Sequence, residues 1–394
     1  METMPTQTYT KVPFSKLRTY LNKNASAEEV NYIEVTDIVA AKLSGKRISP
    51  LGKILKECGK KIALKLPDTI KNLHSMEACF CGCPTLISLA AFPKGITVIR
   101  HCFSECTGLT QAPVIPNTVS DMECCFFHCS NLTEAPAIPK GITSMDACFS
   151  GCTGLTEAPA IPNSVTDMLA CFSGCTSLIQ APFIPDSVTV MGLCFSECTG
   201  LTAAPVLPCS VTNIWGCFIN CIGLTKAPAI PESVTNMRSC FFGCTNLTEA
   251  PALPELVTDL QFCFAGCTGL LQVPAIPKHV TNMENCFEDC ISITNAPVLP
   301  KHVQNMYSCF SGCTGLTAAP AIPNSVTNME DCFKNCASLT KVPSLPKGIE
   351  YISNCFSGCK NLRADSIIVP ASGLEHYREN ASAMGAYPAW FKSE

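Results

Sequence analysis

One motif, Cys-Phe-x-x-Cys, recurs thirteen times in this chain at an unbroken spacing of 23 residues, from Cys79–Cys83 to Cys355–Cys359. No residue is inserted or deleted between the first copy and the last. A fixed period of roughly 20 to 29 residues is typical of a solenoid, in which each unit buries its apolar face against its neighbours. In such a protein, function is expected on the surface that the stack presents, and a catalytic pocket is not the default.

The residues that repeat in every unit have a packing reason. Counted from the first cysteine of each unit, position two is Phe in all thirteen units, and position eight is Leu in twelve, with Ile293 as the exception. Position eighteen is Val or Ile and position twenty-one is Met, Ile or Leu, as in Val165 and Met168. A residue repeated in each turn of a solenoid stacks on its own copies, so its size and shape must match along the stack.

The unit predicts one short strand and one turn. Leu-Thr-x-Ala-Pro-x-Ile is the candidate strand of a parallel sheet, with positions eight, eleven and fourteen pointing inward and position ten facing solvent. Proline at position twelve cannot donate to a ladder, so we expect a strand of about three or four residues, or a bulge at the proline. A second short extended piece is expected at Val-Thr-x-Met.

The Cys-Phe-x-Gly-Cys segment predicts a single helical or 3-10 turn on the opposite face, with Phe and both cysteines turned inward. The predicted fold class is therefore an α/β repeat solenoid in the form of a right-handed curved slab.

The two ends of the chain differ from the repeats, as solenoid ends must. Residues 1–78 are expected to form an N-terminal cap, with helices over Ser15–Lys23 and Pro50–Glu57 and strands over Asn31–Thr36 and Lys61–Pro67. Residues 79–366 are the tandem repeats. Residues 367–394 are expected to form a C-terminal cap: Ile367–Pro370 replaces the next turn, and a helix capped by Ser372 follows, its inner residues being Leu374, Tyr377, Ala381 and Met384. The aromatic segment from Tyr387 to Phe391 is expected to seal this end.

Composition excludes several classes of partner. Hydrophobic residues make up 47% of the chain and charged residues 15%, and the net charge of −4 argues against a nucleic acid or an anionic membrane as partner. No apolar run approaches the roughly 18 residues of a membrane span. The segment Met1–Lys11 is polar and lacks the apolar core of a secretory signal. Either the chain is cytosolic or a signal has been removed, and the sequence leaves both open.

The unit resembles the BspA-like leucine-rich repeats of bacterial surface proteins. That class has a 23-residue unit that reads Ala-Phe-x-x-Cys-x-x-Leu-x-x-Ile-x-Ile-Pro-x-x-Val-x-x-Ile, and the stretches from Cys148 to Leu155 and from Ile161 to Val165 match it closely. The segments Asn31–Thr36, Leu51–Leu55 and Val369–Leu374 are similar to versions from oral spirochaetes. Two departures stand out: cysteine replaces the family's alanine at position one, and Ala-Pro replaces one aliphatic strand residue with a shift of one position.

The resemblance implies a leucine-rich-repeat solenoid without enzymatic activity or cofactor. It further implies a place on the cell surface or outside the cell, and adhesion to host matrix proteins, to host cell-surface proteins or to other bacteria.

The cysteines are the main alternative to a binding function. Twenty-six of the thirty lie at positions one and five. Two cysteines from one unit and two from the next could form a ladder of metal sites, although structural zinc sites usually use Cys-x-x-Cys. Disulfides are a further alternative, but a turn of helix is a strained geometry for a bridge between residues four apart. We favour reduced thiols packed as small apolar groups.

Two features outside the motif could carry chemistry. Cys209 lies at position sixteen, where other units carry Asn, Asp, Glu or Lys, so it is expected to be exposed as a reactive thiol or an intermolecular link, or to have no role. His279 and His302 are one period apart and are expected on an exposed edge, where a solvated row is favoured over weak metal binding. No phosphate-binding loop or nucleophile motif is found in a fitting context.

Binding is predicted at positions that vary between units while their neighbours do not. Position ten is a mixed polar strip without strong charge of either sign, which suits a protein partner. Its candidate binding residues are Glu134, Glu157, Gln180, Lys226, Glu249, Gln272 and Lys341. At position thirteen, mostly Ala or Val, the large exception is Phe183. A second candidate is an apolar patch made of Trp215, Ile219 and Phe242, because exposed aromatics often anchor interfaces.

These observations lead to one prediction and two alternatives. We predict a non-enzymatic module that binds proteins. The first alternative is a cysteine-rich metal-binding or redox protein, and the second is an intracellular repeat scaffold.

Overall fold

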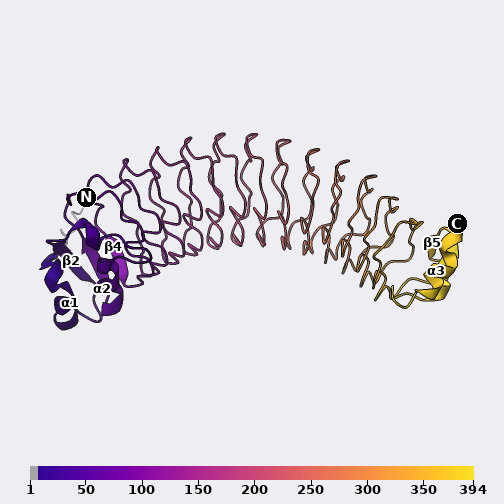
Figure 1. Ribbon diagram of the computed structural model, residues 1–394, viewed down its shortest axis with the longest axis horizontal. Coiled ribbons are helices and arrows are strands. Elements are labelled where there is room, and N and C mark those ends of the chain that lie inside the picture. Colours follow the sequence, from indigo (N-terminus) through magenta and orange to yellow (C-terminus); the bar gives the residue numbers. More distant parts are fainter. Residues whose placement is uncertain (1–7) are drawn as a thin grey trace. The chain divides into compact units, whose positions relative to one another are not determined.

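The computed structural model describes residues 8–394, and Figure 1 shows coil after coil, with the helices confined to the two ends of the chain. The polar segment in which no secretory signal is predicted, Met1–Lys11, lies mostly outside the described residues. Two compact units are present, residues 1–188 with 198–200, and residues 189–197 with 201–394. Each is described by itself below. Among the described residues, no helix is both long and apolar enough to cross a membrane.

The regular elements follow one another in the order β1, α1, β2, η1, α2, β3, β4, β5, η2, α3, η3 and β6. Near the N-terminus these are β1 (Thr10–Pro13), α1 (Phe14–Lys23), β2 (Asn31–Thr36), η1 (Ala40–Lys42), α2 (Pro50–Cys58), β3 (Ile62–Lys65) and β4 (Leu86–Leu89). Near the C-terminus they are β5 (Ile367–Val369), η2 (Ala371–Gly373), α3 (Leu374–Glu379), η3 (Pro388–Trp390) and β6 (Phe391–Ser393). Strands β1 to β4 form a parallel sheet in that order, and β5 pairs in parallel with β6. The helices α1 and α2 and the strand β2 confirm the elements predicted near the N-terminus.

The local sequence explains where α2 begins and ends. Ser49 is the residue before the helix, and its hydroxyl accepts a hydrogen bond from the Gly52 N–H at 2.9 Å. Pro50 occupies the first turn, where a missing N–H costs nothing. Gly59 follows the helix with a left-handed φ of 65°, which glycine adopts without strain.

At the other end, α3 is shorter than predicted and is not capped by Ser372. Gly373 is the residue before the helix and no side chain caps it, because the 3-10 turn η2 runs directly into α3. Tyr377, Ala381 and Met384 are buried as predicted, whereas Leu374 is only partly buried. The aromatic segment divides: Phe391 is buried against Tyr377, and Tyr387 is 67% exposed.

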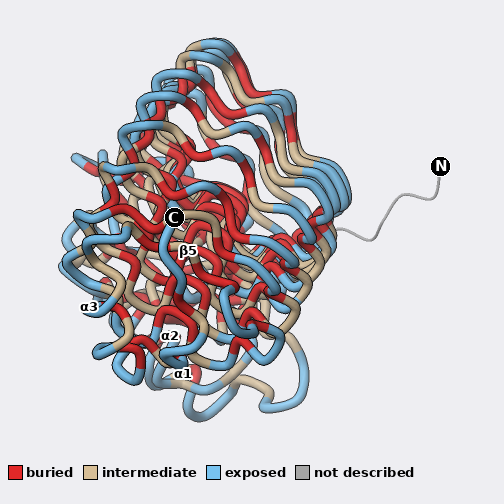
Figure 2. The backbone as a smooth tube through the Cα atoms, turned by 90° about the vertical axis from the view of Figure 1, so that its right-hand side faces the viewer, coloured by how far each residue is buried: buried red, intermediate tan, exposed pale blue. Residues whose placement is uncertain are grey.

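Each 23-residue repeat forms one coil whose buried residues lie on the inside, as Figure 2 shows. The position-two phenylalanines stack ring on ring, for example Phe126 on Phe149 with centroids 5.5 Å apart and planes 3° apart. Leu at position eight and Val or Ile at position eighteen are buried beside them. The predicted inward orientation of Phe and of both cysteines is confirmed.

The strand predicted at Leu-Thr-x-Ala-Pro-x-Ile is reduced in most coils to one bridged residue. Position ten makes isolated parallel bridges, such as Glu134 with Glu157, and position twenty makes a second row, such as Ser144 with Asp167. Proline at position twelve removes the N–H that would continue the first ladder. Pairing at position ten is therefore shorter than the three or four residues predicted.

Most inter-coil main-chain bonds lie elsewhere, between position twenty and position four. Where one repeat runs into the next, the N–H groups of Met145, Ala147, Phe149 and Gly151 each donate to the carbonyl 22 residues further along the chain, at 2.6–2.9 Å. The intervening N–H groups bond within the coil, as Cys148 does to the Met145 carbonyl at 3.1 Å.

The Cys-Phe segment is therefore a series of tight turns and does not continue as a helix. Left-handed residues interrupt it at positions twenty-three and four, such as Ala147 with a φ of 47° and Gly151 with a φ of 73°.

Candidate binding surfaces

The position-ten row faces solvent, as predicted. Main-chain bridges align Gln111, Glu134, Glu157 and Gln180 in the first unit. Further bridges in the second unit align Lys226, Glu249 and Gln272, and then Asn295, Ala318 and Lys341. Every residue of the row from position 111 onward is exposed. The binding role of these residues remains a prediction.

The row is exposed because it lies between two positions of each coil whose side chains enter the core. Leu at position eight and Ile or Leu at position fourteen are mostly buried, so the residues between them must arch over the core. Threonine at position nine ties one arch to the next: the Thr248 hydroxyl donates to the Thr225 carbonyl at 3.3 Å, and the Thr340 hydroxyl donates to the Thr317 carbonyl at 3.0 Å. The row therefore presents side chains from a fixed main chain.

A second exposed row, at position thirteen, is apolar. Phe183 is 79% exposed, and the valines of this row are at least as exposed. Two residues that the sequence analysis did not single out add to this surface, Ile179 at 55% and Leu271 at 61% exposure. Both stand at position nine where most coils carry threonine, and that replacement was the signal available in the sequence.

A hollow of about 510 Å³ opens on this surface within the first unit. It lies across two successive coils and is lined by Thr156, Glu157, Ala158, Ile179, Gln180, Ala181 and Pro182. Two of the predicted binding residues, Glu157 and Gln180, therefore share one concavity with Ile179.

The second predicted patch lies in the other unit and is less open than expected. Trp215 is 39% and Phe242 36% exposed, whereas Ile219 is only partly exposed. The Asn220 N–H donates to the Phe242 carbonyl at 2.7 Å, which places Ile219 and Phe242 in successive coils. The Phe242 ring packs edge-on against Phe262, with centroids 6.3 Å apart. A binding role for this patch stays a prediction.

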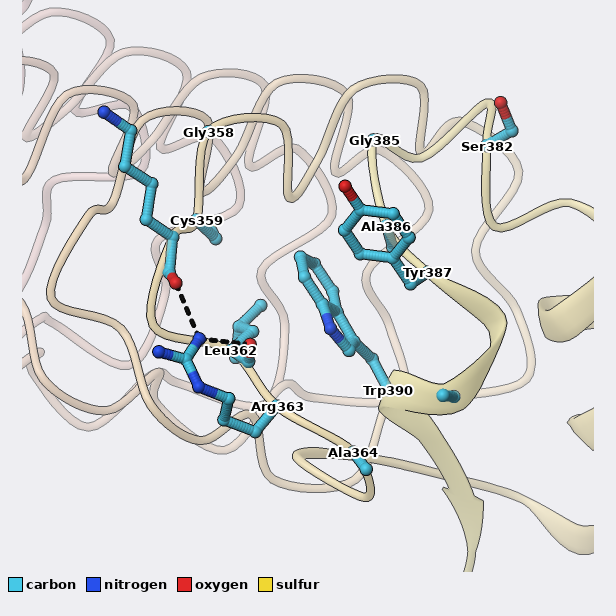
Figure 3. Close-up of a pocket in the computed structure, with 12 residues that line it drawn as sticks. Gly358, Cys359, Leu362, Arg363, Ala364, Ser382, Gly385, Ala386, Tyr387 and Trp390 are labelled. Atoms are coloured by element: carbon cyan, nitrogen blue, oxygen red, sulfur yellow. Dashed lines mark hydrogen bonds between the residues drawn. The ribbon is translucent and has the colours of Figure 1, made fainter.

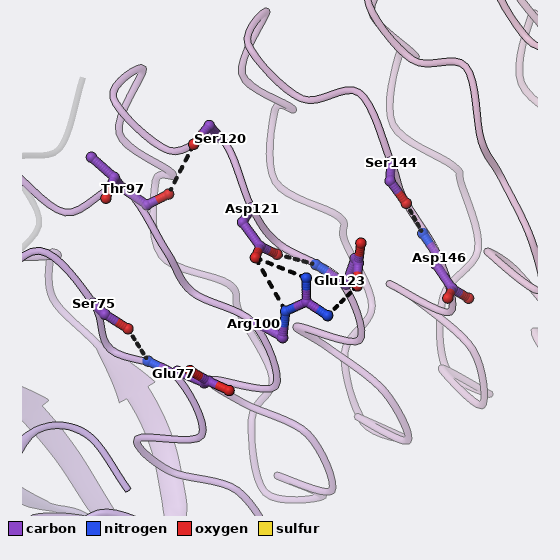
Figure 4. Close-up of polar contacts among 9 residues, drawn as sticks. All are labelled: Ser75, Glu77, Thr97, Arg100, Ser120, Asp121, Glu123, Ser144 and Asp146. Carbon is purple, nitrogen blue, oxygen red and sulfur yellow. Dashed lines mark hydrogen bonds and ion pairs between the residues drawn. The ribbon is translucent and has the colours of Figure 1, made fainter. Parts of the chain in front are cut away.

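A polar cluster on the face formed by positions twenty and twenty-two links three coils (Figure 4). The Arg100 guanidinium donates to Asp121 from two nitrogens, at 3.0 and 3.1 Å, and pairs with Glu123. Asp121 in turn accepts from the Glu123 N–H at 3.3 Å. Partial burial and then the nearby Asp167 carboxylate raise the pKa of Asp146. Because these side chains mainly satisfy one another and the turns, the cluster holds neighbouring coils together.

The C-terminal end of the array carries a larger hollow of about 900 Å³ (Figure 3). Its lining includes the rings of Tyr387 and Trp390, which meet edge-to-face at 5.1 Å, and the cations Lys360 and Arg363. One guanidinium nitrogen of Arg363 donates to the carbonyls of Lys360 and Leu362 at 2.7 and 2.9 Å. In Figure 3 the Arg363 guanidinium points away from Trp390, so this cation and the aromatic rings do not converge.

The repeat cysteines are packed, protonated groups of the core. All twenty-six are at most 2% exposed, which confirms the burial predicted for them. The position-five thiol donates to the carbonyl of a position-two Phe in the preceding coil, as Cys152 does to Phe126 at 3.1 Å. Burial raises the pKa values of the repeat thiols from Cys79 to Cys152 and from Cys240 to Cys359, that of Cys244 to about 12. Thiolate, the form that binds metals and attacks electrophiles, is therefore suppressed at neutral pH.

The remaining cysteines and the histidines lie nearer the surface. Among residues 8–394 no two cysteines are joined by a disulfide, and Cys209 is exposed as predicted. Burial raises the pKa of the partly buried Cys124 to about 11. His279 and His302 are exposed, also as predicted. Across residues 8–394, no group of three or more His, Cys, Asp or Glu side chains is arranged to hold a metal ion.

Stacked coils joined by parallel bridges, with a buried leucine at position eight of nearly every coil, define the class of leucine-rich-repeat solenoids. Within that class, the family model for the BspA type leucine rich repeat region matches residues 53–179, 125–248, 169–294 and 238–363. The chain therefore belongs to the BspA-type leucine-rich-repeat family, whose repeats generally serve protein–protein interaction.

Two solved structures share the fold. A leucine-rich repeat protein from Bacteroides ovatus is 24% identical, with a TM-score of 0.59 over 84% of this chain and 92% of that one. A leucine rich cell surface protein from Faecalibacterium prausnitzii is 21% identical, with a TM-score of 0.52 over 83% of this chain and 91% of that one. No curated protein matches the chain.

Proposed function

We propose that this protein is a non-enzymatic binding module that adheres to host matrix proteins, to host cell-surface proteins or to other bacteria. The observation that carries the proposal is the position-ten row, a ladder of exposed and varied side chains on a main chain that repeats without insertion. A rigid repeated backbone with a variable surface is how solenoids present extended binding faces.

A place at the cell surface or outside the cell is part of the proposal. It is supported by the solved relative from Faecalibacterium prausnitzii, which is described as a cell surface protein. Fractionation of the source cell, with detection of this chain in the surface and cytosolic fractions, separates surface display from the alternative of an intracellular scaffold.

The thiols give less support to the redox and metal alternative. Their sulfur atoms are buried, and those at position five donate to main-chain carbonyls. Elemental analysis of protein purified without a tag tests this alternative directly. Zinc or iron bound in proportion to the number of coils would favour it over the binding module.

The binding function is tested by a screen of the full chain against purified host matrix proteins and whole bacteria, with binding measured by biolayer interferometry and sedimentation. We expect at least one saturable partner. The test variant carries Glu134→Ala, Glu157→Ala, Lys226→Ala and Glu249→Ala, because alanine already occupies position ten at Ala203 and Ala318.

A control variant changes four exposed charges at position sixteen, away from the position-ten row: Lys140→Ala, Asp186→Ala, Lys278→Ala and Lys301→Ala. We expect the test variant to lose at least tenfold in affinity and the control variant to bind as the wild type does. A wild-type chain that binds none of these proteins or cells would contradict the adhesion proposal. A partner that both variants bind equally would move the site away from the position-ten row.

A further inference from the structure

Three unusual features occur in two successive coils on the position-ten face, within residues 148–188, and Phe183 directly follows the lining residue Pro182. The hollow of about 510 Å³ lies there, and the exposed Ile179 lines it. Phe183, the single aromatic residue at position thirteen of any coil, follows Ile179 by four residues and is 79% exposed. Large apolar side chains exposed beside a concavity are typical of the centre of a protein interface.

Two carboxylates follow one another on the position-ten row here, and one of them, Glu157, lines the hollow. Glu134 and Glu157 are partners in a parallel bridge, so they stand one coil spacing apart, about 4.8 Å. Both are exposed, and neither has an ion-pair partner among residues 8–394. The row continues on each side with the neutral Gln111 and Gln180. Like charges directly opposite one another in a sheet are destabilising, so a cation placed between these two carboxylates would relieve a repulsion that the free protein carries.

The second unit contains a natural comparison. Leu271 is exposed at position nine, as Ile179 is, and its neighbours at position ten are Lys226, Glu249 and Gln272. There the charges are mixed, and position thirteen of the same coil is Ala275. An apolar residue at position nine therefore occurs twice on the bridged part of the row, but two neighbouring carboxylates and an exposed aromatic accompany only Ile179.

We propose that this surface, defined by Glu134, Glu157, Ile179, Gln180 and Phe183, binds a short extended segment of a partner protein that carries a lysine or arginine next to a bulky apolar side chain. The cation lies between the two carboxylates, and the apolar side chain fills the hollow against Ile179 and Phe183. This inference rests on the proposed protein-binding function and assigns its centre and the chemistry of its ligand.

The probe is an array of nine-residue peptides, each with two lysines and with leucine or phenylalanine at varied spacing. A matched array has glutamate in place of each lysine. Binding of the full chain is measured by fluorescence polarisation at low and at high salt. We expect a subset of the lysine peptides to bind and their glutamate counterparts to bind at least tenfold more weakly. We also expect affinity to fall as salt rises, since exposed charges are screened.

Each test variant introduces a residue that the same position already carries in another coil, so the fold is kept. Ile179→Thr, Phe183→Ala and Glu157→Gln are the test variants, and Leu271→Thr, Val298→Ala and Glu255→Asn are their controls in the second unit, the last removing an exposed carboxylate outside the position-ten row. We expect Ile179→Thr and Phe183→Ala each to weaken peptide binding at least tenfold, Glu157→Gln to weaken it and to flatten its salt dependence, and the controls to change it less than twofold.

The outcomes separate this inference from the broader proposal. Equal binding of lysine and glutamate peptides, or control variants that lose as much as the test variants, would overturn the inference. The screen for matrix and bacterial partners is read independently. A partner found in that screen whose binding survives all three test variants would retain the binding function and reject this surface as its centre.

Discussion

The sheet β1–β4 and the coils that follow it are both parallel stacks, but different atoms hold them together. Strand β2 pairs with β3 over four residues, from Asn31 to Glu34. Along the same edge of the later coils, the bridges are at position ten, and only the last of them is extended by a bridge from Val342 to Ile367. Position twelve explains the difference, because the Ala90 N–H donates to the Leu64 carbonyl at 2.8 Å, and the next eleven coils carry proline there.

In the coils, the main-chain hydrogen bonds missing at position twelve are replaced by others on the opposite side of each coil. Their main-chain bonds run through the Cys-Phe turns, and the phenylalanine stack and the thiol-to-carbonyl bonds repeat at every step. In the N-terminal sheet the aligned buried residues differ in shape, as Ile33 does from its partner Leu64. A solenoid can therefore lose most of one strand ladder when side chains of one shape stack in every coil.

Alkaline pH should separate the two regions most strongly. Burial raises the pKa values of the repeat thiols above the unfolded value of about 8.5, so folding stability is complete below that pH and falls as pH rises toward the folded values. Two thiols per coil correspond to roughly 3 kcal/mol per coil for each pH unit in that window, at about 1.4 kcal/mol per group. By contrast, the segment from Thr10 to Lys65, which contains β1, β2 and β3, has a single cysteine, Cys58.

We expect the urea midpoint, measured by circular dichroism under reducing conditions, to drop sharply between pH 8 and pH 10. Hydrogen exchange of peptides from the coils should accelerate before that of peptides from β2 and β3. A double variant with Cys148→Ala and Cys171→Ala, which carries the residue that related repeats have at position one, should show a smaller drop. A midpoint that does not change with pH would contradict the role given to the buried thiols.

Removing one ring from the stack should have the next largest effect. Phe149 is fully buried between Phe126 and Phe172, and Phe149→Ala should cost about 3–5 kcal/mol in the free energy of unfolding. The matched control is Phe127→Ala in the preceding coil, whose ring is partly exposed and which should cost less than about 1 kcal/mol. Equal losses in urea unfolding would show that the stack contributes nothing specific.

Proline, the residue that the coils carry at position twelve, should weaken the N-terminal sheet when it is placed at Ala90. Ala90→Pro removes the N–H that bonds to Leu64 and should cost roughly 1–3 kcal/mol. Ala90→Ser keeps the N–H and serves as its control. Urea unfolding and hydrogen exchange at Leu64 would report the change. If the two variants are equally stable, position twelve does not set the length of pairing.

The smallest effect is expected at the surface of the array. Cys209 is the one exposed cysteine among the thirty, so a thiol reagent should modify it first and without measurable loss of stability. Cys58, Cys81 and Cys124 are partly buried and should follow more slowly, and the other twenty-six should react only on unfolding. Mass spectrometry of the labelled protein reads this order, and an unmodified Cys209 in the native state would contradict it.

Much of the fold was predictable because its signals are local or periodic. The period of 23 residues predicted stacked coils, and the invariant Phe and Leu predicted the core. Alternating apolar residues from Asn31 to Thr36 predicted β2 with its observed bounds. The exposure of position ten followed from the apolar residues on both sides of it. The C-terminal cap was harder to predict. Ser372 was expected to cap a helix, but it lies inside the 3-10 turn η2, which no pattern in the sequence indicates.

The candidate site was predicted only in part. Glu157, Gln180 and Phe183 stood out as variable positions, but Ile179 was passed over because one apolar residue in a polar row has no period. The hollow that joins it to Glu157 depends on how far each side chain projects from neighbouring coils. The shape of the hollow depends on pairs of residues 23 positions apart in the chain, so no local sequence pattern predicts it.

By itself, the sequence determined that identical coils stack, which residues fill them and which row faces solvent, since a strict repeat must place like residues in like surroundings. Only the tertiary structure decided which atoms join the coils. The left-handed residues at positions twenty-three and four direct alternate N–H groups toward the next coil, and proline leaves the other edge with one bridge per coil. Hydrogen bonding between coils depends on the direction of each N–H and C=O group, which composition and spacing do not encode.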